Sequence, residues 1–168
     1  KEGVLVIHNQ ENLGFTKSVN RGVEASKGEI IVKIDADGEI PEKYVEEAVK
    51  KLRGFDVVIG KKERFHRPSE KIVSFLSSFF TGLPYGADMF PGLIVFKRSV
   101  YEKIGLDEWN SWLLGFLYKA VKKGYKVGLI PITFNQRLDS KIGYCWRTDL
   151  KLLRAGLRAF IHGFVLQK

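Results

Sequence analysis

Two carboxylates one residue apart, Asp35 and Asp37, are the sharpest chemical feature of the sequence and lie in the run D-A-D-G. The run follows an apolar, β-branched stretch at residues 29–34 that predicts a buried strand. Ligands of open α/β sheets bind beyond the carboxyl ends of the strands, and paired carboxylates there suit a hard cation such as Mg²⁺ or Mn²⁺. We therefore predict a metal site on Asp35 and Asp37, with Glu39 within reach of the same ion; the alternative is a polar turn.

The order of helices and strands sets where this pair would lie. Apolar periodicity and Gly and Pro punctuation predict strands at residues 3–8, 29–34, 56–60, 92–96 and 126–134. The same reading predicts helices at residues 15–27, 41–53, 69–82, 97–104 and 109–123, with a further helix from about residue 147. The opening β-α-β-α-β order predicts an α/β fold with a mostly parallel central sheet, flanked by helices through right-handed crossovers.

Composition places the chain among soluble globular domains and narrows its partners. Its 168 residues fit one domain, and 45% hydrophobic with 28% charged residues excludes a disordered chain. The single cysteine, Cys145, excludes an internal disulfide, and three His far apart in sequence argue against a zinc site, which favours a reducing, cytosolic compartment. No run of about 18 apolar residues predicts a transmembrane helix. The net charge of +9 favours an anionic partner, which is nucleic acid, lipid headgroups or a phosphorylated small molecule.

The residues that lead into the carboxylate pair form a pattern of their own. Asn12 and Gly14 give N-x-G, the following helix carries Lys17 and Asn20, and a G-E turn at residues 28–29 precedes the strand and D-A-D. Together these motifs resemble the family 2 glycosyltransferase pattern. Segments at residues 56–62, 86–98 and 124–141 extend the resemblance to about residue 146, and they are similar to polyprenyl-phosphate sugar transferases of the dolichol-phosphate mannose synthase type.

This resemblance implies the GT-A fold of nucleotide-diphospho-sugar transferases. It also implies an inverting, metal-dependent transfer of mannose or glucose from a GDP- or UDP-linked donor to a polyprenyl or dolichyl phosphate. The residues implied in donor binding are Asn12, Gly14, Lys17, Asn20 and Asp35, and those implied in catalysis are Asp35, Asp37 and Asp88.

A phosphate acceptor needs cations to bind it, and arginine suits phosphate especially well. The basic residues from which its ligands would be drawn are Lys62, Arg64, Lys71, Arg98, Arg137 and Lys141. For each of them the alternative is a solvated surface charge. The resemblance favours Lys62, Arg137 and Lys141.

The chain also departs from the family pattern. Members begin with a P-x-Y-N-E strand and a D-D-G-S strand that hold the base and ribose, and neither motif is present here. We therefore expect an N-terminal part of the domain to precede Lys1. Residues 111–115 also lack the Glu-Asp pair that serves as catalytic base in many members. A phosphate monoester is already anionic and needs no such base, so this departure favours a phosphate acceptor over a sugar hydroxyl.

The expected organisation is a truncated catalytic domain at residues 1–146 and a basic amphipathic helix at residues 147–168. This helix favours peripheral contact with the cytoplasmic face of a membrane, and the alternative is a terminal helix packed on the sheet. Three other classes stay open: a family 2 enzyme with a glycan hydroxyl acceptor, a non-catalytic basic module for membrane or nucleic acid, and a nucleotidyltransferase. Because no known nucleic-acid motif organises the charge, we expect no nucleic-acid partner.

Overall fold

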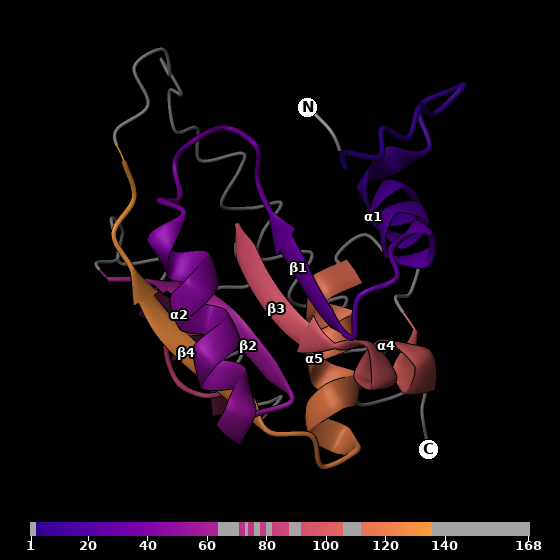
Figure 1. Ribbon diagram of the computed structural model, residues 1–168. Helices are drawn as coiled ribbons and strands as arrows, with labels where there is room; N and C mark the ends of the chain where they lie inside the picture. Colours follow the sequence, from indigo (N-terminus) through magenta and orange to yellow (C-terminus); the bar gives the residue numbers. More distant parts are fainter. Residues whose placement is uncertain are drawn as a thin grey trace.

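The structure is a computed structural model and describes residues 3–63, 71–72, 74–75, 78–79, 82–87, 92–105 and 112–135. Its elements are α1 (Gly14–Ala25), β1 (Ile30–Ile34), α2 (Lys43–Lys51), the 3₁₀ turn η1 (Leu52–Gly54), β2 (Val57–Lys62), β3 (Leu93–Lys97), α4 (Arg98–Ile104), α5 (Trp112–Lys122) and β4 (Val127–Ile132) (Figure 1). Each matches a predicted element to within a few residues. Within the predicted helix at 69–82, the described residues 71–72, 74–75 and 78–79 are helical and Gly82 is not; the predicted helix at 147–168 lies outside the described residues.

The four strands form one mixed sheet in the order β1-β3-β2-β4. β3 pairs antiparallel with both β1 and β2, whereas β2 pairs parallel with β4. β1, β2 and β4 therefore run in the same direction, and β3 lies reversed between β1 and β2. The α/β class is confirmed, but the pairing differs from the mostly parallel sheet that was predicted. The sequence of β3 does not reveal this, because an apolar strand buried on both faces reads the same in either direction.

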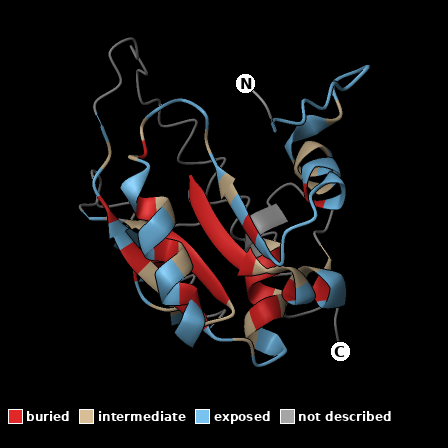
Figure 2. Cartoon of the chain, viewed as in Figure 1, coloured by how far each residue is buried: buried red, intermediate tan, exposed pale blue. Residues whose placement is uncertain are grey.

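Alternating side chains of the sheet build two hydrophobic cores, one on each face. α2 covers one face, where Tyr44 and Ala48 pack in the same cluster as Val58 of β2. α4, α5 and the end of α1 cover the other face, where the rings of Phe116 and Phe96 lie 5.0 Å apart between centroids. The strands β2 and β3 are consequently buried on both faces (Figure 2). This double core fixes the strands from which the site residues extend.

The N-terminal apolar run does not form the buried strand that its sequence predicts. Residues 3–8 belong to no strand of the described sheet, and Val4 and Leu5 are exposed. An apolar run forms a strand only where a neighbour supplies backbone hydrogen-bond partners. β1 is the edge strand on the α1 side of the described sheet, and its residues Ile30 and Ile34 are 43% and 38% exposed.

Asp56 ties three strands together at the edge of the sheet opposite to Asp35. Its carboxylate accepts hydrogen bonds from Lys97 Nζ at 2.7 Å and from the backbone N–H of Lys126 at 2.9 Å. Burial by itself raises the pKa of Asp56, but these hydrogen bonds and the two lysine charges outweigh it, so the pKa lies below its ordinary value of 3.8. The ionised carboxylate therefore stabilises the fold above that ordinary pKa, and this stability is lost as pH falls through the lowered folded pKa.

Replacing Asp56 by Asn should lower the free energy of unfolding at pH 7 by about 1–3 kcal/mol, because Lys97 and Lys126 lose a charged acceptor. The lower half of this range is expected, since the Lys97 side chain is 42% exposed and its charge is screened. Urea denaturation of both proteins at pH 7, and then in steps below pH 3.8, measures the difference. The difference should shrink as the wild-type carboxylate is protonated. A constant difference would contradict the ion pair.

Candidate active site

The carboxyl ends of β1, β2 and β4 meet at one edge of the sheet, because these strands run in the same direction. Asp35 directly follows β1 at this edge, and Lys62 is the last residue of β2 there. Asn135, just after β4, joins this strand to the loop that follows β1. Its backbone N–H donates to Glu39 O at 2.8 Å, and its Nδ2 donates to Gly38 O at 3.2 Å. Two strands therefore hold the loop that carries the carboxylates.

The D-A-D-G run closes as a tight turn within this loop. Gly38 has a φ of 75°, a conformation that side-chain-bearing residues adopt with difficulty. The backbone N–H of Glu39 donates to Asp37 Oδ1 at 3.1 Å. The polar turn and the metal site, which are alternatives in the sequence, are compatible in the structure because the turn fixes the orientation of the Asp37 carboxylate.

Asp35 is held between β3 and a lysine of its own strand. Its backbone N–H donates to Gly92 O at 2.9 Å, just before β3. A Cβ placed on Gly92 would lie 3.0 Å from Asp35 Oδ2, so only glycine leaves space beside this oxygen. The other oxygen, Oδ1, accepts a hydrogen bond from Lys33 Nζ at 2.5 Å. One carboxylate oxygen of Asp35 is thus hydrogen-bonded to Lys33, and the other lies beside Gly92.

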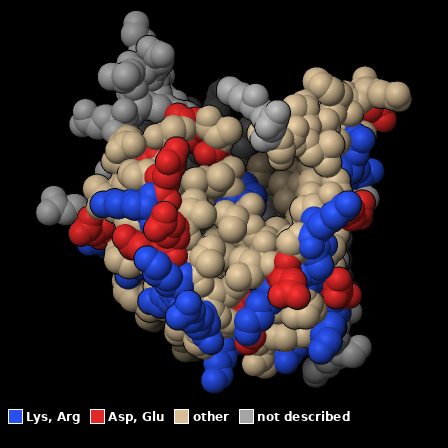
Figure 3. Space-filling view, viewed as in Figure 1, with Lys and Arg blue, Asp and Glu red and all other residues tan. Residues whose placement is uncertain are grey.

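Lys33 connects the carboxylate to α1. Its side chain is only 14% exposed, and its Nζ lies 5.2 Å from the ring centroid of Phe15 in the first turn of α1. Ammonium ions are attracted to aromatic faces at such distances. In the space-filling view a basic side chain lies recessed between the acidic loop that follows β1 and the surface of α1 (Figure 3). The start of α1 is therefore linked to Asp35 through Lys33.

The first predicted donor residues organise the start of α1. Asn12 Oδ1 accepts the backbone N–H of Gly14 at 2.9 Å, and Gly14 has a φ of 74°. The carbonyl of Gly14 in turn accepts a hydrogen bond from Ser18 Oγ at 2.8 Å. Asn12 satisfies a backbone donor that the helix start would otherwise leave open, so the N-x-G motif shapes this turn.

The two other predicted donor residues of α1 lie farther along the helix. Lys17 is exposed, and Asn20 is half-buried. Asn20 Oδ1 accepts the hydroxyl of Tyr101 in α4 at 3.5 Å, and burial raises the pKa of Tyr101. Asn20 thus also has a packing contact that accounts for a polar residue at this position.

Asp35 and Asp37 fit a divalent cation whose remaining ligands come from substrate phosphates and water. Asp35 and Asp37 supply hard oxygen donors, and the missing Cβ of Gly92 leaves room beside Asp35 Oδ2. Among the described residues, however, no three His, Cys, Asp or Glu side chains come together as a metal site. The predicted third ligand, Glu39, is therefore not grouped with the other two. Mg²⁺ commonly uses one or two carboxylates and completes its shell with substrate phosphates and water, which this site allows.

Arg98, predicted as a phosphate ligand, instead joins the beginning of α4 to the segment between α1 and β1. Its Nε donates to Gly28 O at 2.7 Å, and its Nη2 donates to Ser26 O at 2.8 Å and Ser26 Oγ at 2.7 Å. Arg98 follows β3, whose last residue pairs with Ile30 at the beginning of β1, so it lies at the opposite edge of the sheet from Asp35. The phosphate assignment of Arg98 is corrected to a structural one.

Replacing Arg98 by Met should lower the free energy of unfolding by about 1–3 kcal/mol, because backbone carbonyls lose a charged donor. The KM for the acceptor should not change. Thermal denaturation and acceptor titration of the same preparations separate the two effects. Arg53→Met removes a charge from an exposed position in η1 and should leave both quantities at the wild-type value. A raised acceptor KM in Arg98→Met alone would restore the phosphate role.

The remaining cation candidates are only partly placed. The backbone of Lys62 ends β2 at the same edge as Asp35, and Lys71 is exposed on a helical segment. Three other cation candidates, Arg64, Arg137 and Lys141, lie outside the described residues, and so does Asp88, the third residue implied in catalysis.

Three residues shape the site without having been predicted. The sequence places Lys33 in a predicted strand and Gly92 and Asn135 in segments that resemble the family, and it predicts no site role for any of them. The one available signal was a single charged residue inside the apolar run at residues 30–34, two positions before Asp35 on the same face. Gly92 and Asn135 act through contacts between segments distant in sequence, which no local pattern reveals.

A solved structure shares the fold of this chain. The chain resembles a mannosyltransferase from Pyrobaculum calidifontis, solved in complex with GDP-mannose and Mn²⁺, with a TM-score of 0.66 and 22% sequence identity. The match covers 93% of this chain and 46% of that chain. The predicted GT-A fold is confirmed, and the carboxylate edge belongs to a glycosyltransferase fold.

The family follows from the sequence itself. Residues 1–105 match the family model described as glycosyl transferase family 2. An uncharacterized protein of Methanocaldococcus jannaschii is 33% identical over 152 residues, which cover 79% of this chain and 61% of that relative. This chain belongs to glycosyl transferase family 2, as its motifs predicted. It spans less than two thirds of the relative and about half of the solved mannosyltransferase.

Proposed function

We propose that the protein transfers a sugar, with inversion, from a nucleotide sugar to a polyprenyl phosphate in a metal-dependent reaction. The observation that carries the proposal is the pair Asp35 and Asp37 at the carboxyl edge of the sheet in a family 2 chain. The fold neighbour, solved with GDP-mannose and Mn²⁺, supports a GDP-linked donor and mannose as the sugar. A bound Mg²⁺ or Mn²⁺ would neutralise the charge that develops on the leaving nucleoside diphosphate.

The reaction is a displacement at the anomeric carbon of the sugar. A phosphate oxygen of the acceptor forms the new bond to this carbon, and the bond to the donor diphosphate breaks, so the nucleoside diphosphate leaves with the electron pair. The attacking oxygen is already ionised, and no side chain has to remove a proton from it. This agrees with residues 111–115, which contain no carboxylate.

Each group at the edge has a defined task in this scheme. Asp35 and Asp37 would hold a divalent cation that binds the diphosphate of the donor, and the turn at Gly38 together with Asn135 keeps their loop in place. Lys62, whose backbone ends β2 at the same edge, is our first choice for the acceptor phosphate. Arg98 is not part of this proposal, because its guanidinium donates to Gly28 O at the opposite edge.

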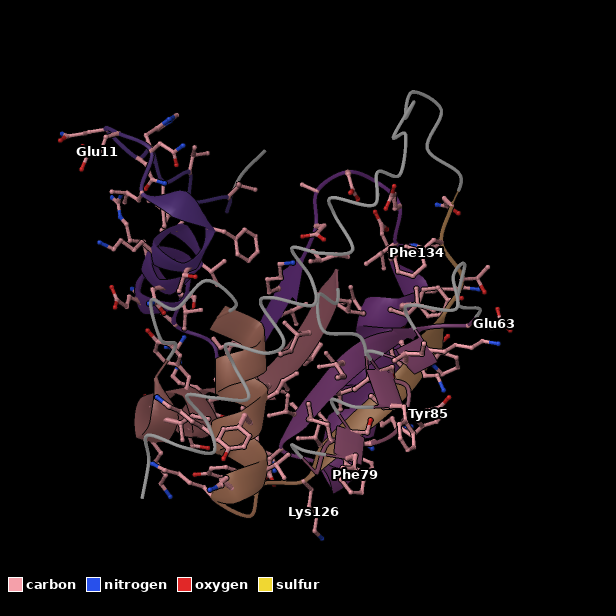
Figure 4. All side chains as sticks on the ribbon, turned by 180° about the vertical axis from the view of Figure 1, so that it is seen from behind. Glu11, Glu63, Phe79, Tyr85, Lys126 and Phe134 are labelled. Atoms are coloured by element: carbon pink, nitrogen blue, oxygen red, sulfur yellow. The ribbon has the colours of Figure 1, made fainter. Side chains whose placement is uncertain are left out.

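An outward-facing apolar stripe supports a lipid acceptor and peripheral membrane contact. Ser74 and Ser78 of the segment at 71–79 bond inward to the backbone of residues 84–87, whereas Phe75 and Phe79 are 56% and 73% exposed. Tyr85 is exposed on the same side of the sheet as α5, as is Phe79 (Figure 4). Exposed aromatic residues near lysines suit a membrane interface. Within the described part of the chain, no helix is long and apolar enough to span a membrane.

The test uses the complete gene product, labelled nucleotide sugars and two acceptors that differ only in the head group, polyprenyl phosphate and polyprenol. The panel contains GDP-mannose, GDP-glucose and UDP-glucose, each with Mn²⁺ or Mg²⁺. The expected result is label in the organic phase with polyprenyl phosphate and one donor, and none with polyprenol. Transfer to polyprenol would contradict the phosphate acceptor. Transfer only to a soluble glycan would move the enzyme to the hydroxyl-acceptor branch.

A further inference from the structure

Lys33 is a basic residue within an otherwise apolar strand. β1 reads Ile-Ile-Val-Lys-Ile, and the Lys33 side chain is only 14% exposed opposite Ile94 of β3. Burying an ammonium is unfavourable unless an acceptor compensates it. The acceptor is Asp35 Oδ1, 2.5 Å from Lys33 Nζ. A residue of the proposed metal site is thus already paired with a positive charge.

This pair is held in place from both sides. The Phe15 ring lies 5.2 Å from Lys33 Nζ, measured to its centroid, and the backbone N–H of Asp35 is fixed by Gly92 O at 2.9 Å. The lysine stem is flexible, whereas Asp35 is anchored at its backbone. If the contact breaks, we therefore expect the longer Lys33 side chain to move away, while the backbone of Asp35 stays in place.

We propose that Lys33 is a displaceable counter-ion of Asp35 that makes metal binding depend on donor binding, an inference that rests on the proposed function. A divalent cation and an ammonium on the same carboxylate repel each other. A cation alone must therefore remove Lys33 from Asp35 without offering it another anion. A cation that arrives with a diphosphate brings such an anion, and Lys33 then pairs with a phosphate oxygen.

The ligand set of the site supports the same coupling. The described residues bring no three metal-binding side chains together, so a cation on Asp35 and Asp37 needs further oxygens from outside the protein. The donor diphosphate supplies oxygens to the cation and an anion to Lys33. By linkage, the nucleotide strengthens cation binding by the same factor as the cation strengthens nucleotide binding. Lys33 raises this factor because it weakens the binding of the cation alone.

The test measures Mn²⁺ affinity by electron paramagnetic resonance, with and without GDP, on the complete gene product. Wild type should bind Mn²⁺ weakly, and GDP should strengthen the binding. Lys33→Met should bind free Mn²⁺ about tenfold more tightly, and GDP should strengthen that binding less than in wild type. Lys27→Met also removes one positive charge, but from an exposed position before the beginning of β1, and should behave as wild type.

Two further variants keep the outcomes distinct. Lys33→Gln is measured beside Lys33→Met, and circular dichroism verifies that each is folded. Unchanged or weaker affinity for free Mn²⁺ in the folded Lys33 variants would overturn this inference. If Asp35→Asn abolishes Mn²⁺ binding in the same series, the proposed function survives that result. Absence of Mn²⁺ binding by wild type even with GDP would overturn both.

Discussion

Replacement of Asp35 by Asn should reduce sugar transfer by about 10³-fold, because the neutral amide binds the cation that holds the donor diphosphate much more weakly. Asp37→Asn should have an effect of the same order. The measurement is the initial rate of label transfer at saturating donor and Mn²⁺, expressed per folded molecule. Near-normal activity in either variant would contradict the role of the carboxylate pair.

The stability of Asp35→Asn needs its own control, because the change leaves Lys33 without its carboxylate. We expect a loss of about 1–3 kcal/mol in the free energy of unfolding. The double variant Asp35→Asn, Lys33→Met removes the unpaired ammonium and should recover stability but not activity. Glu46→Gln neutralises an exposed carboxylate on α2 and should leave both at the wild-type level. Recovery of activity in the double variant would show that Asp35 matters only as a partner of Lys33.

Replacement of Gly92 by Ala should reduce transfer by about 10²-fold, since small displacements of reacting groups are costly. The added Cβ would lie 2.6 Å from Ile40 Cδ1 and 3.0 Å from Asp35 Oδ2, so the carboxylate has to move. The free energy of unfolding should fall by about 1–3 kcal/mol through overpacking. Transfer rates and urea denaturation of the same samples give both numbers.

Gly128→Ala is the matched control for this variant. Its Cβ would meet the Phe55 ring at 2.9 Å, near the beginning of β4 and away from the carboxylate edge. Stability should fall by a similar amount, but activity per folded molecule should stay at the wild-type value. Equal activity losses in the two variants would mean that Gly92 affects the fold in general and not Asp35.

The local parts of the fold could be predicted because they depend on neighbouring residues. Apolar runs bounded by glycine and charge mark β1 and β2, and the position of Asp35 after β1 follows directly from that pattern. The direction of β3 could not be predicted, because pairing is decided by contacts between distant segments. The strand predicted at residues 3–8 was wrong for the same reason. The sequence of this run suits a strand, but the described sheet offers no neighbouring strand for it to pair with.

In the candidate site too, the features that depend on neighbouring residues could be predicted, and those that depend on distant segments could not. Asp35 and Asp37 are recognised by type and spacing, and the turn at Gly38 follows from the glycine itself. Arg98 is a phosphate candidate in the sequence because arginine suits phosphate, yet its guanidinium binds carbonyls 70 or more residues earlier in the chain. The family and the candidate carboxylate pair could thus be predicted from sequence, and the role of this pair in donor and metal binding stays a prediction. The contacts that position these carboxylates could be seen only in the structure.

The most direct test of the central claim is transfer of labelled mannose from GDP-mannose to polyprenyl phosphate, assayed with Mn²⁺ and again after chelation. We expect label in the organic phase that depends on Mn²⁺ and is absent with Asp35→Asn. Undiminished transfer after complete removal of divalent ions, or equal transfer by wild type and Asp35→Asn, would contradict a metal-dependent reaction at this pair of carboxylates.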